Sequence, residues 1–152
     1  IEIGKGEVLR KGKDVAVIAY GSMVYPAMNA AEQLARSGVN VSVINARFVK
    51  PLDAKLILAT ARESSLIVTV EEAYLAGGFG SAVMELLEEN GLQDKVKVVR
   101  MGVPDEIVSH GDPNRLLGDY GLDADGIYKR VLGSLDALNE ERNGGRKMRA
   151  VK

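Results

Sequence analysis

The chain has 152 residues, of which 46% are hydrophobic, and this matches one folded domain with a substantial core. It has no cysteine and one histidine, which excludes disulfides, thiol nucleophiles and metal sites built from several cysteines or histidines. The formal net charge of −1 is uneven, because the last eleven residues hold five basic residues and no acidic one.

We expect residues 139–152 to form a basic, disordered tail that follows a folded domain over residues 1–138. Gly144-Gly145 interrupts the tail and it lacks aromatic residues, so we expect no nucleic-acid binding. No stretch of about 18 apolar residues occurs, and the N-terminus does not resemble a signal peptide. These patterns predict a cytoplasmic protein that does not contact a membrane.

The first half of the chain alternates strand and helix patterns. The polar residues 6–10 favour an antiparallel edge strand. The apolar residues 15–20 then predict a buried strand, and alanine and leucine at helical spacing up to Leu34 predict a helix. We expect Ser22 to be the N-cap of this helix and Gly38 to end it.

The alternation continues through the second half. Residues 39–44, 66–70 and 96–99 predict buried strands, Asp53 is expected to cap a second helix, and Phe79 begins the apolar stripe of a third. Asp112 and Asp123 are expected to open a short and a longer final helix. The sequence therefore predicts an α/β domain with a five-stranded, mostly parallel sheet, one antiparallel edge strand, and helices on both faces.

The glycine-rich turn at residues 77–81 precedes the third helix. A glycine turn at a helix N-terminus can present backbone amides to a phosphate, which makes Gly78, Phe79, Gly80 and Ser81 candidate anion-contacting residues. The dinucleotide fingerprint is incomplete, because Val83 stands where its third glycine would be. A tight turn that allows close packing is the preferred interpretation.

Glu71 and Glu72 end a predicted central strand, where open α/β sheets usually place ligand sites. Neighbouring strand residues face opposite ways, so the two glutamates do not form a ready acid/base pair. We expect one of them to be buried and paired, with Arg47 as the candidate partner, and we prefer a structural ion pair to catalysis.

Asp105 and His110 lie in the loop before the short helix. The imidazole of His110 could exchange protons near neutral pH, but a lone histidine beside a glycine is more often a loop or interface residue. None of the serines lies in a G-x-S-x-G motif, which does not favour a serine hydrolase. The loops at residues 71–81 and 105–111 both follow parallel strands, so we expect them to lie together and to face a partner.

Several segments together carry a family resemblance. The most specific are A-R-F-V-K-P-L-D at residues 46–53 and V-E-E-A-Y-L-A-G-G-F-G-S at residues 70–81, followed by G-V-P-D at residues 102–105 and G-L-D-A-D-G-I at residues 121–127. With these motifs the chain resembles the C-terminal domain of the 1-deoxy-D-xylulose-5-phosphate synthase family, within the transketolases. The match covers residues 3–133.

The resemblance implies an enzyme that uses thiamin diphosphate and magnesium to join pyruvate, with loss of CO₂, to D-glyceraldehyde 3-phosphate. In that family other domains hold the cofactor, so we expect this chain to bind no cofactor or metal and to be a non-catalytic, dimer-forming part of the enzyme. It departs from the family at Ala73, where a polar residue is common.

Two alternatives remain open. One is the matching domain of a 2-oxoacid dehydrogenase β-subunit or a transketolase, and the A-R-F-V-K-P-L-D string disfavours it. The other is a free-standing regulatory domain that binds a small anion at Gly78 to Ser81.

Overall fold

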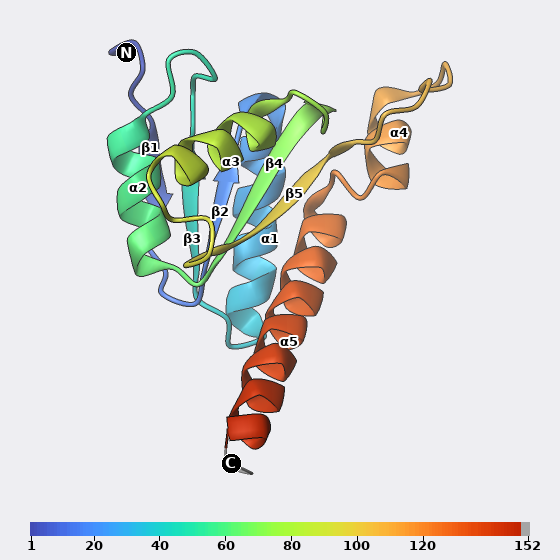
Figure 1. Ribbon diagram of the computed structural model, residues 1–152. Helices are drawn as coiled ribbons and strands as arrows, with labels where there is room; N and C mark the ends of the chain where they lie inside the picture. The colour runs from blue at the N-terminus through green and yellow to red at the C-terminus, as the bar shows by residue number, and fades with distance from the viewer. Residues whose placement is uncertain (150–152) are drawn as a thin grey trace.

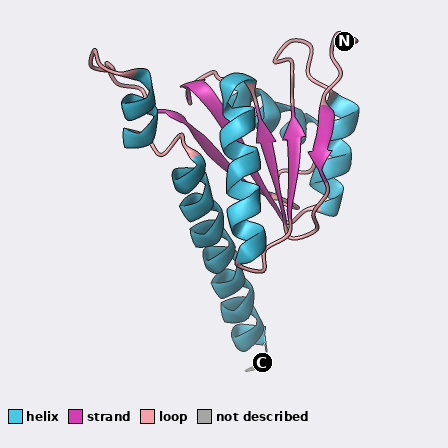
Figure 2. Ribbon diagram, turned by 180° about the vertical axis from the view of Figure 1, so that it is seen from behind, coloured by secondary structure: helices cyan, strands magenta, loops and turns pink. Residues whose placement is uncertain are grey.

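The computed structural model of the chain describes residues 1–149, in which one sheet lies between two layers of helices (Figures 1 and 2). The five strands are β1 (Glu7–Arg10), β2 (Val15–Ala19), β3 (Val41–Asn45), β4 (Leu66–Tyr74) and β5 (Lys97–Val103). The helical elements are η1 (Gly21–Met23), α1 (Val24–Arg36), α2 (Ala54–Glu63), α3 (Phe79–Glu89), α4 (Pro113–Asp119) and α5 (Ala124–Arg149).

The sheet has the strand order β1-β3-β2-β4-β5. Strand β1 pairs antiparallel with β3, and every other neighbouring pair is parallel. The expected fold, with its antiparallel edge strand near residues 6–10, is therefore confirmed. The central strands are apolar throughout because helices cover both of their faces.

Alternate residues of β2 show how the two faces divide. Val15 and Val17 belong to a core beneath α1 and α5, whereas Ala16 and Ile18 belong to a core beneath α2 and α3. Figure 2 shows α1 and α5 side by side in front of the sheet. The carboxyl ends of the parallel strands consequently meet at one edge of the domain, flanked by α3 on one side and α4 on the other.

Three of the four expected N-caps are confirmed. The side chains of Asp53, Asp112 and Asp123 each accept a hydrogen bond from a first-turn backbone amide of α2, α4 and α5. The expectation for Ser22 is wrong, since Ser22 lies in η1 and α1 begins at Val24 without a side-chain cap. Its hydroxyl donates instead to Oε2 of Glu72, across the edge of the sheet.

The last helix is longer than the sequence indicated. We expected a disordered tail over residues 139–152, but residues 139–149 continue α5 as helix. Nζ of Lys97 lies 2.6 Å from Oε1 of Glu141 and connects this part of α5 to β5. Glu140, Glu141 and Arg142 in this segment are good helix formers, whereas Gly144 and Gly145 are not. Residues 150–152 lie outside the described residues.

Candidate functional site

The carboxylate of Glu71 lies at the N-terminus of α3. Glu71 is 1% exposed, and its Oε2 accepts a hydrogen bond of 2.6 Å from the amide of Phe79 while Oε1 accepts one of 2.8 Å from the amide of Gly80. These are the first two amides of the helix, which have no partner within it. A negative charge here is also stabilised by the helix dipole.

Glycines make this approach of β4 to α3 possible. A Cβ atom at Gly78 would lie 2.3 Å from Oε2 of Glu71 and 2.3 Å from the carbonyl oxygen of Tyr74. A Cβ atom at Gly80 would lie 2.6 Å from Oγ1 of Thr69. The glycine turn therefore allows α3 to pack closely against β4. This agrees with the interpretation preferred from the sequence.

This arrangement bears on the anion-binding alternative. A phosphate at Gly78 to Ser81 would need the amides that Glu71 already occupies, and it would meet that carboxylate at van der Waals distance. The expectation that one glutamate is buried and paired is correct, but its partners are backbone amides and not Arg47. The domain supplies its own anion at the helix N-terminus.

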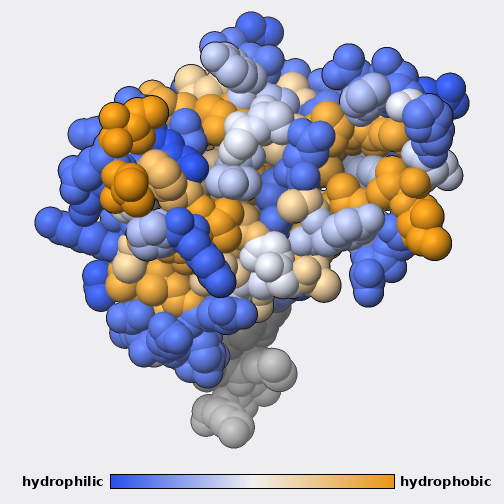
Figure 3. Space-filling view, turned by 90° about the horizontal axis from the view of Figure 1, so that it is seen from above, coloured by the Kyte–Doolittle hydropathy of each residue, from blue (hydrophilic) through white to orange (hydrophobic). Residues whose placement is uncertain are grey.

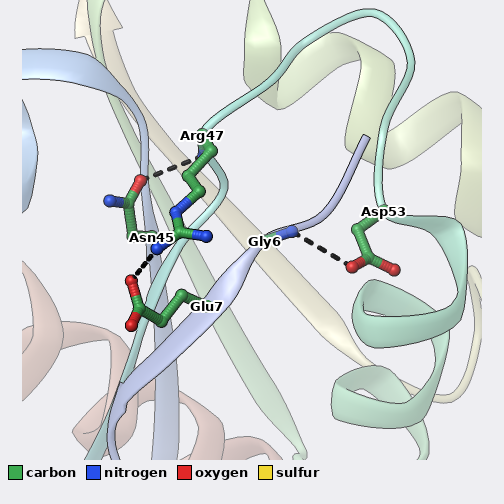
Figure 4. Close-up of polar contacts among 5 residues, drawn as sticks. All are labelled: Gly6, Glu7, Asn45, Arg47 and Asp53. Atoms are coloured by element: carbon green, nitrogen blue, oxygen red, sulfur yellow. Dashed lines mark hydrogen bonds and ion pairs between the residues drawn. The ribbon is translucent and has the colours of Figure 1, made fainter. Parts of the chain in front are cut away.

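Arg47 follows β3, and β2 separates that strand from β4, which carries Glu71. Its guanidinium pairs with the carboxylate of Glu7 on β1, so the expected pairing with Glu71 or Glu72 is wrong (Figure 4). The strand order explains the difference, because β2 separates β3 from β4 while β1 is the outer neighbour of β3. Arg47 has a φ of 58°, and its amide donates to Oδ1 of Asn45 at 3.0 Å.

Asp53 connects the same region to the N-terminal strand. Its Oδ1 caps α2 through the amide of Leu56 at 3.0 Å, and its Oδ2 accepts from the amide of Gly6 at 3.1 Å (Figure 4). One carboxylate therefore holds both the start of α2 and the start of β1. The A-R-F-V-K-P-L-D segment thus has a structural role at the β1 edge.

Phe79 belongs to the core. It is 1% exposed, and its ring stacks on Tyr20 with a centroid separation of 5.7 Å. The sequence placed Phe79 both on the apolar stripe of the third helix and in a loop expected to face a partner, and its burial favours the core role. The same turn positions Ser81, whose hydroxyl donates to the carbonyl oxygen of Leu75 at 2.8 Å and accepts from Nη1 of Arg100 at 2.8 Å.

The loop at residues 105–111 is much more open. Asp105 and His110 are both exposed, and no hydrogen bond fixes either side chain in the described part of the chain. The hydroxyl of Tyr120 donates to Oε1 of Glu106 at 2.7 Å. This hydrogen bond is the main reason that the pKa of Tyr120 is raised above its ordinary value of 10.0, with desolvation and the Glu106 charge adding to it.

The two loops adjoin at the carboxyl edge of the sheet. The amide of Leu75 donates to the carbonyl oxygen of Val103 at 2.9 Å, and Tyr74 and Val108 line one cavity of about 290 Å³. Figure 3 looks onto this edge and shows hydrophobic surface on the α4 side and on the N-terminal side, separated by polar surface. The exposed Ile107, at 97%, belongs to the loop itself.

The comparisons with known proteins agree with this geometry. Residues 4–127 match the family described as Transketolase, C-terminal domain. The chain belongs to this family. A 1-deoxy-D-xylulose-5-phosphate synthase of Geobacter metallireducens is 55% identical over 131 residues, covering 86% of the chain and 21% of that protein. A synthase of the same name from a Synechococcus species is 49% identical over 142 residues, covering 93% of the chain and 22% of that protein.

A solved structure extends the comparison to the fold. It is described as a split gene transketolase, inactive beta4 tetramer, and it is 37% identical with a TM-score of 0.81, over 90% of the chain and 44% of that protein. The resemblance to the C-terminal part of the synthases is thus confirmed. The chain spans only about one fifth of the length of the two curated relatives.

Sequence reasoning missed two residues of this transketolase C-terminal domain. Arg100 was part of a strand pattern, but its register opposite Thr69 places it beside the glycine turn. Tyr120 lies beyond the loop that it holds, and only the fold brings it to Glu106.

In residues 1–149 no group of three or more His, Asp or Glu side chains could hold a metal ion. No helix in the same range has the length and apolar character needed to cross a membrane.

Proposed function

We propose that the chain is the non-catalytic C-terminal domain of a 1-deoxy-D-xylulose-5-phosphate synthase, in which it supports assembly. The observation that carries the proposal is the identity of 49–55% to the two synthases, spread over 86–93% of the chain. The full enzyme would be a cytoplasmic, magnesium- and thiamin-diphosphate-dependent transferase, which forms the 1-deoxy-D-xylulose 5-phosphate used for isoprenoid and thiamin synthesis.

The described residues do not fit thiamin diphosphate or its magnesium ion. The helix N-terminus that could hold a diphosphate is filled by Glu71, and this part of the chain offers no cluster of metal ligands. We therefore assign the cofactor to the rest of the enzyme and expect the isolated chain to be inactive. The description of the split gene transketolase as an inactive tetramer supports this expectation.

The proposed contact surface is the carboxyl edge of the sheet, formed by residues 72–76 and 105–111. Its exposed Tyr74 and Ile107, together with Asp105 and His110, would face another domain or the second subunit of a homodimer. Glu71 and Phe79 lie beneath this surface and support it without being accessible.

A domain exchange tests the proposal. The corresponding domain of the Geobacter metallireducens synthase is replaced by this chain, and the conversion of pyruvate and D-glyceraldehyde 3-phosphate is measured together with the subunit state. We expect activity and assembly close to those of the parent, whereas the parent without its C-terminal domain should lose both. A folded chimera that remains monomeric and inactive would contradict the proposal.

The isolated chain provides a second readout. Calorimetric titration with thiamin diphosphate and magnesium should give no saturable heat, and the Geobacter enzyme serves as the positive control. Titration with inorganic phosphate should be equally flat, because Glu71 occupies the helix amides. A saturable, phosphate-dependent heat would instead support the regulatory-domain alternative.

A further inference from the structure

The two edges of the sheet differ in how they are protected. Strand β1 has four residues and a register irregularity between Val8 and Arg10, features that discourage pairing with another chain. Strand β5 has seven residues and pairs regularly with β4 from Lys97 to Met101. Within residues 1–149 nothing pairs with its outer side.

The hydrogen-bond pattern shows which groups of β5 face outward. The amide of Lys97 donates to Ser65 and the carbonyl of Val103 accepts from Leu75, so the odd-numbered residues point toward β4. Backbone direction alternates along a strand. The N–H and C=O groups of Val98, Arg100 and Gly102 therefore face the open edge.

A groove lies along this edge, between β5 and α5. Its volume is about 890 Å³, and the α5 positions that border it include Gly126, Gly133 and Ala137, whose small side chains leave the space between helix and strand unfilled. Figure 1 shows α5 descending beside β5 from the level of α4. The groove leaves space next to the outward-facing backbone groups.

The charges of the groove are mainly positive. Lys97 comes from β5, the exposed Lys129 and Arg130 come from α5, and Asp119 is its one acidic lining residue. Arg100 also lines the groove, but its Nη1 donates to the carbonyl oxygen of Leu75 and to Oγ of Ser81. Lys97 contacts Glu141 outside the lining. A segment that enters the groove would meet more positive than negative side chains.

We propose that this groove binds an extended, acidic segment of a partner protein, which pairs with β5 as a sixth strand. The alternating donors and acceptors of β5 suit a peptide backbone, and the basic side chains suit an acidic sequence. A second copy of the chain fits poorly, since pairing two β5 strands would bring two grooves of the same mainly positive charge together. A nucleic acid would use the charges but not the strand edge.

The test uses the 152-residue chain and a labelled, end-blocked peptide of seven alternating glutamate and valine residues. We expect the fluorescence anisotropy of the glutamate and valine peptide to rise to saturation as the chain is added, and the matching lysine and valine peptide not to bind. Binding of the acidic peptide should also slow amide exchange at Val98, Arg100 and Gly102. The double variant Lys129→Glu with Arg130→Glu should weaken binding by about tenfold or more. The control Lys11→Glu with Lys13→Glu makes the same charge change on the β1 side and should leave binding unchanged.

A backbone variant separates strand pairing from charge attraction. Val98→Pro removes an outward N–H without removing a hydrogen bond to β4, so the fold should survive while binding falls by about tenfold. Circular dichroism confirms the fold of each variant. The proposal fails if the acidic peptide shows no saturable binding, or if both double variants weaken its binding equally. It also fails if a short oligothymidylate binds in place of the peptide, or if a folded Val98→Pro variant binds the peptide as well as the parent does.

Discussion

The turn at residues 71–81 and the loop at residues 105–111 lie at the same edge of the sheet but are built differently. In the turn, a buried carboxylate holds two helix amides, and an aromatic ring fills the core beneath. In the loop, Ile107 is 97% exposed, and the hydrogen bond between Tyr120 and Glu106 lies at the surface. Acidic residues and glycines thus serve as internal structure in one region and as exposed surface in the other.

The largest expected effect of a substitution in the turn is at Phe79. Replacement by alanine removes a ring that is 1% exposed and stacked on Tyr20, which should lower the free energy of unfolding by about 3–5 kcal/mol. Urea denaturation of the isolated chain measures it. The matched loop variant is Ile107→Ala, which should change stability by less than about 0.5 kcal/mol. Equal losses in the two variants would remove the distinction between the regions.

The second largest loss of stability should come from substitution of Glu71. Glu71→Gln keeps the shape of the side chain but removes the charge and turns one acceptor into a donor that faces a helix amide, so we expect a loss of about 2–3 kcal/mol. The neighbouring Glu72→Gln is the control, because Glu72 is exposed and should lose less than about 0.5 kcal/mol. Comparable denaturation midpoints for the two variants would mean that the buried carboxylate contributes little.

Alanine substitutions at two glycines should give a smaller difference. At Gly78 the new Cβ would lie 2.3 Å from both Glu71 and Tyr74 atoms, which should cost about 1–3 kcal/mol. At Gly111 the nearest atom is 3.6 Å away, an ordinary contact with the side chain of Leu116. Thermal unfolding of the two variants should show a clear loss only for Gly78→Ala, and a stable Gly78→Ala variant would require the turn to shift away from β4.

The sequence predicted the strands and helices well because their patterns are local. The run at Val15 and the capping residue Asp53 each reflect a nearby structural need, namely burial on both faces of a strand and a partner for helix amides. The antiparallel edge was also predictable, since a polar strand next to a basic turn cannot lie in the middle of a sheet. The resemblance to a known family strengthened these expectations.

The partners of charged side chains were harder to predict because they depend on strand order. Arg47 and Glu71 both follow parallel strands, but β2 lies between those strands and Glu7 on β1 is closer to Arg47. For Glu71 the sequence pointed to a cationic partner, whereas two backbone amides satisfy the carboxylate. The residue types in a sequence do not indicate which backbone amides will bind a buried side chain. The extension of α5 toward Arg149 was not predicted either, because the basic charge and the two glycines of this segment favoured a tail.

The smallest expected effect concerns the loop and its dependence on pH. The hydrogen bond to Glu106 raises the pKa of Tyr120, followed in importance by desolvation and by the charge of Glu106. A group with a raised pKa contributes stability that is complete below its unfolded value, here 10.0, and that is lost as the pH rises through the folded value. The bond should therefore be intact at neutral pH and break only in strongly alkaline solution.

An ultraviolet titration of tyrosinate can isolate this one group. The difference between the chain and its Tyr120→Phe variant gives the curve of Tyr120, whose midpoint should lie above the ordinary value of 10.0. Glu106→Gln removes the charge and should bring the midpoint down toward that value, while Glu72→Gln, which leaves the Tyr120 hydroxyl untouched, should not move it. If the midpoint is the same in the Glu106→Gln variant and the parent, the contact between Tyr120 and Glu106 does not hold the loop in solution. The loop would then have no anchor comparable to Glu71 in the turn.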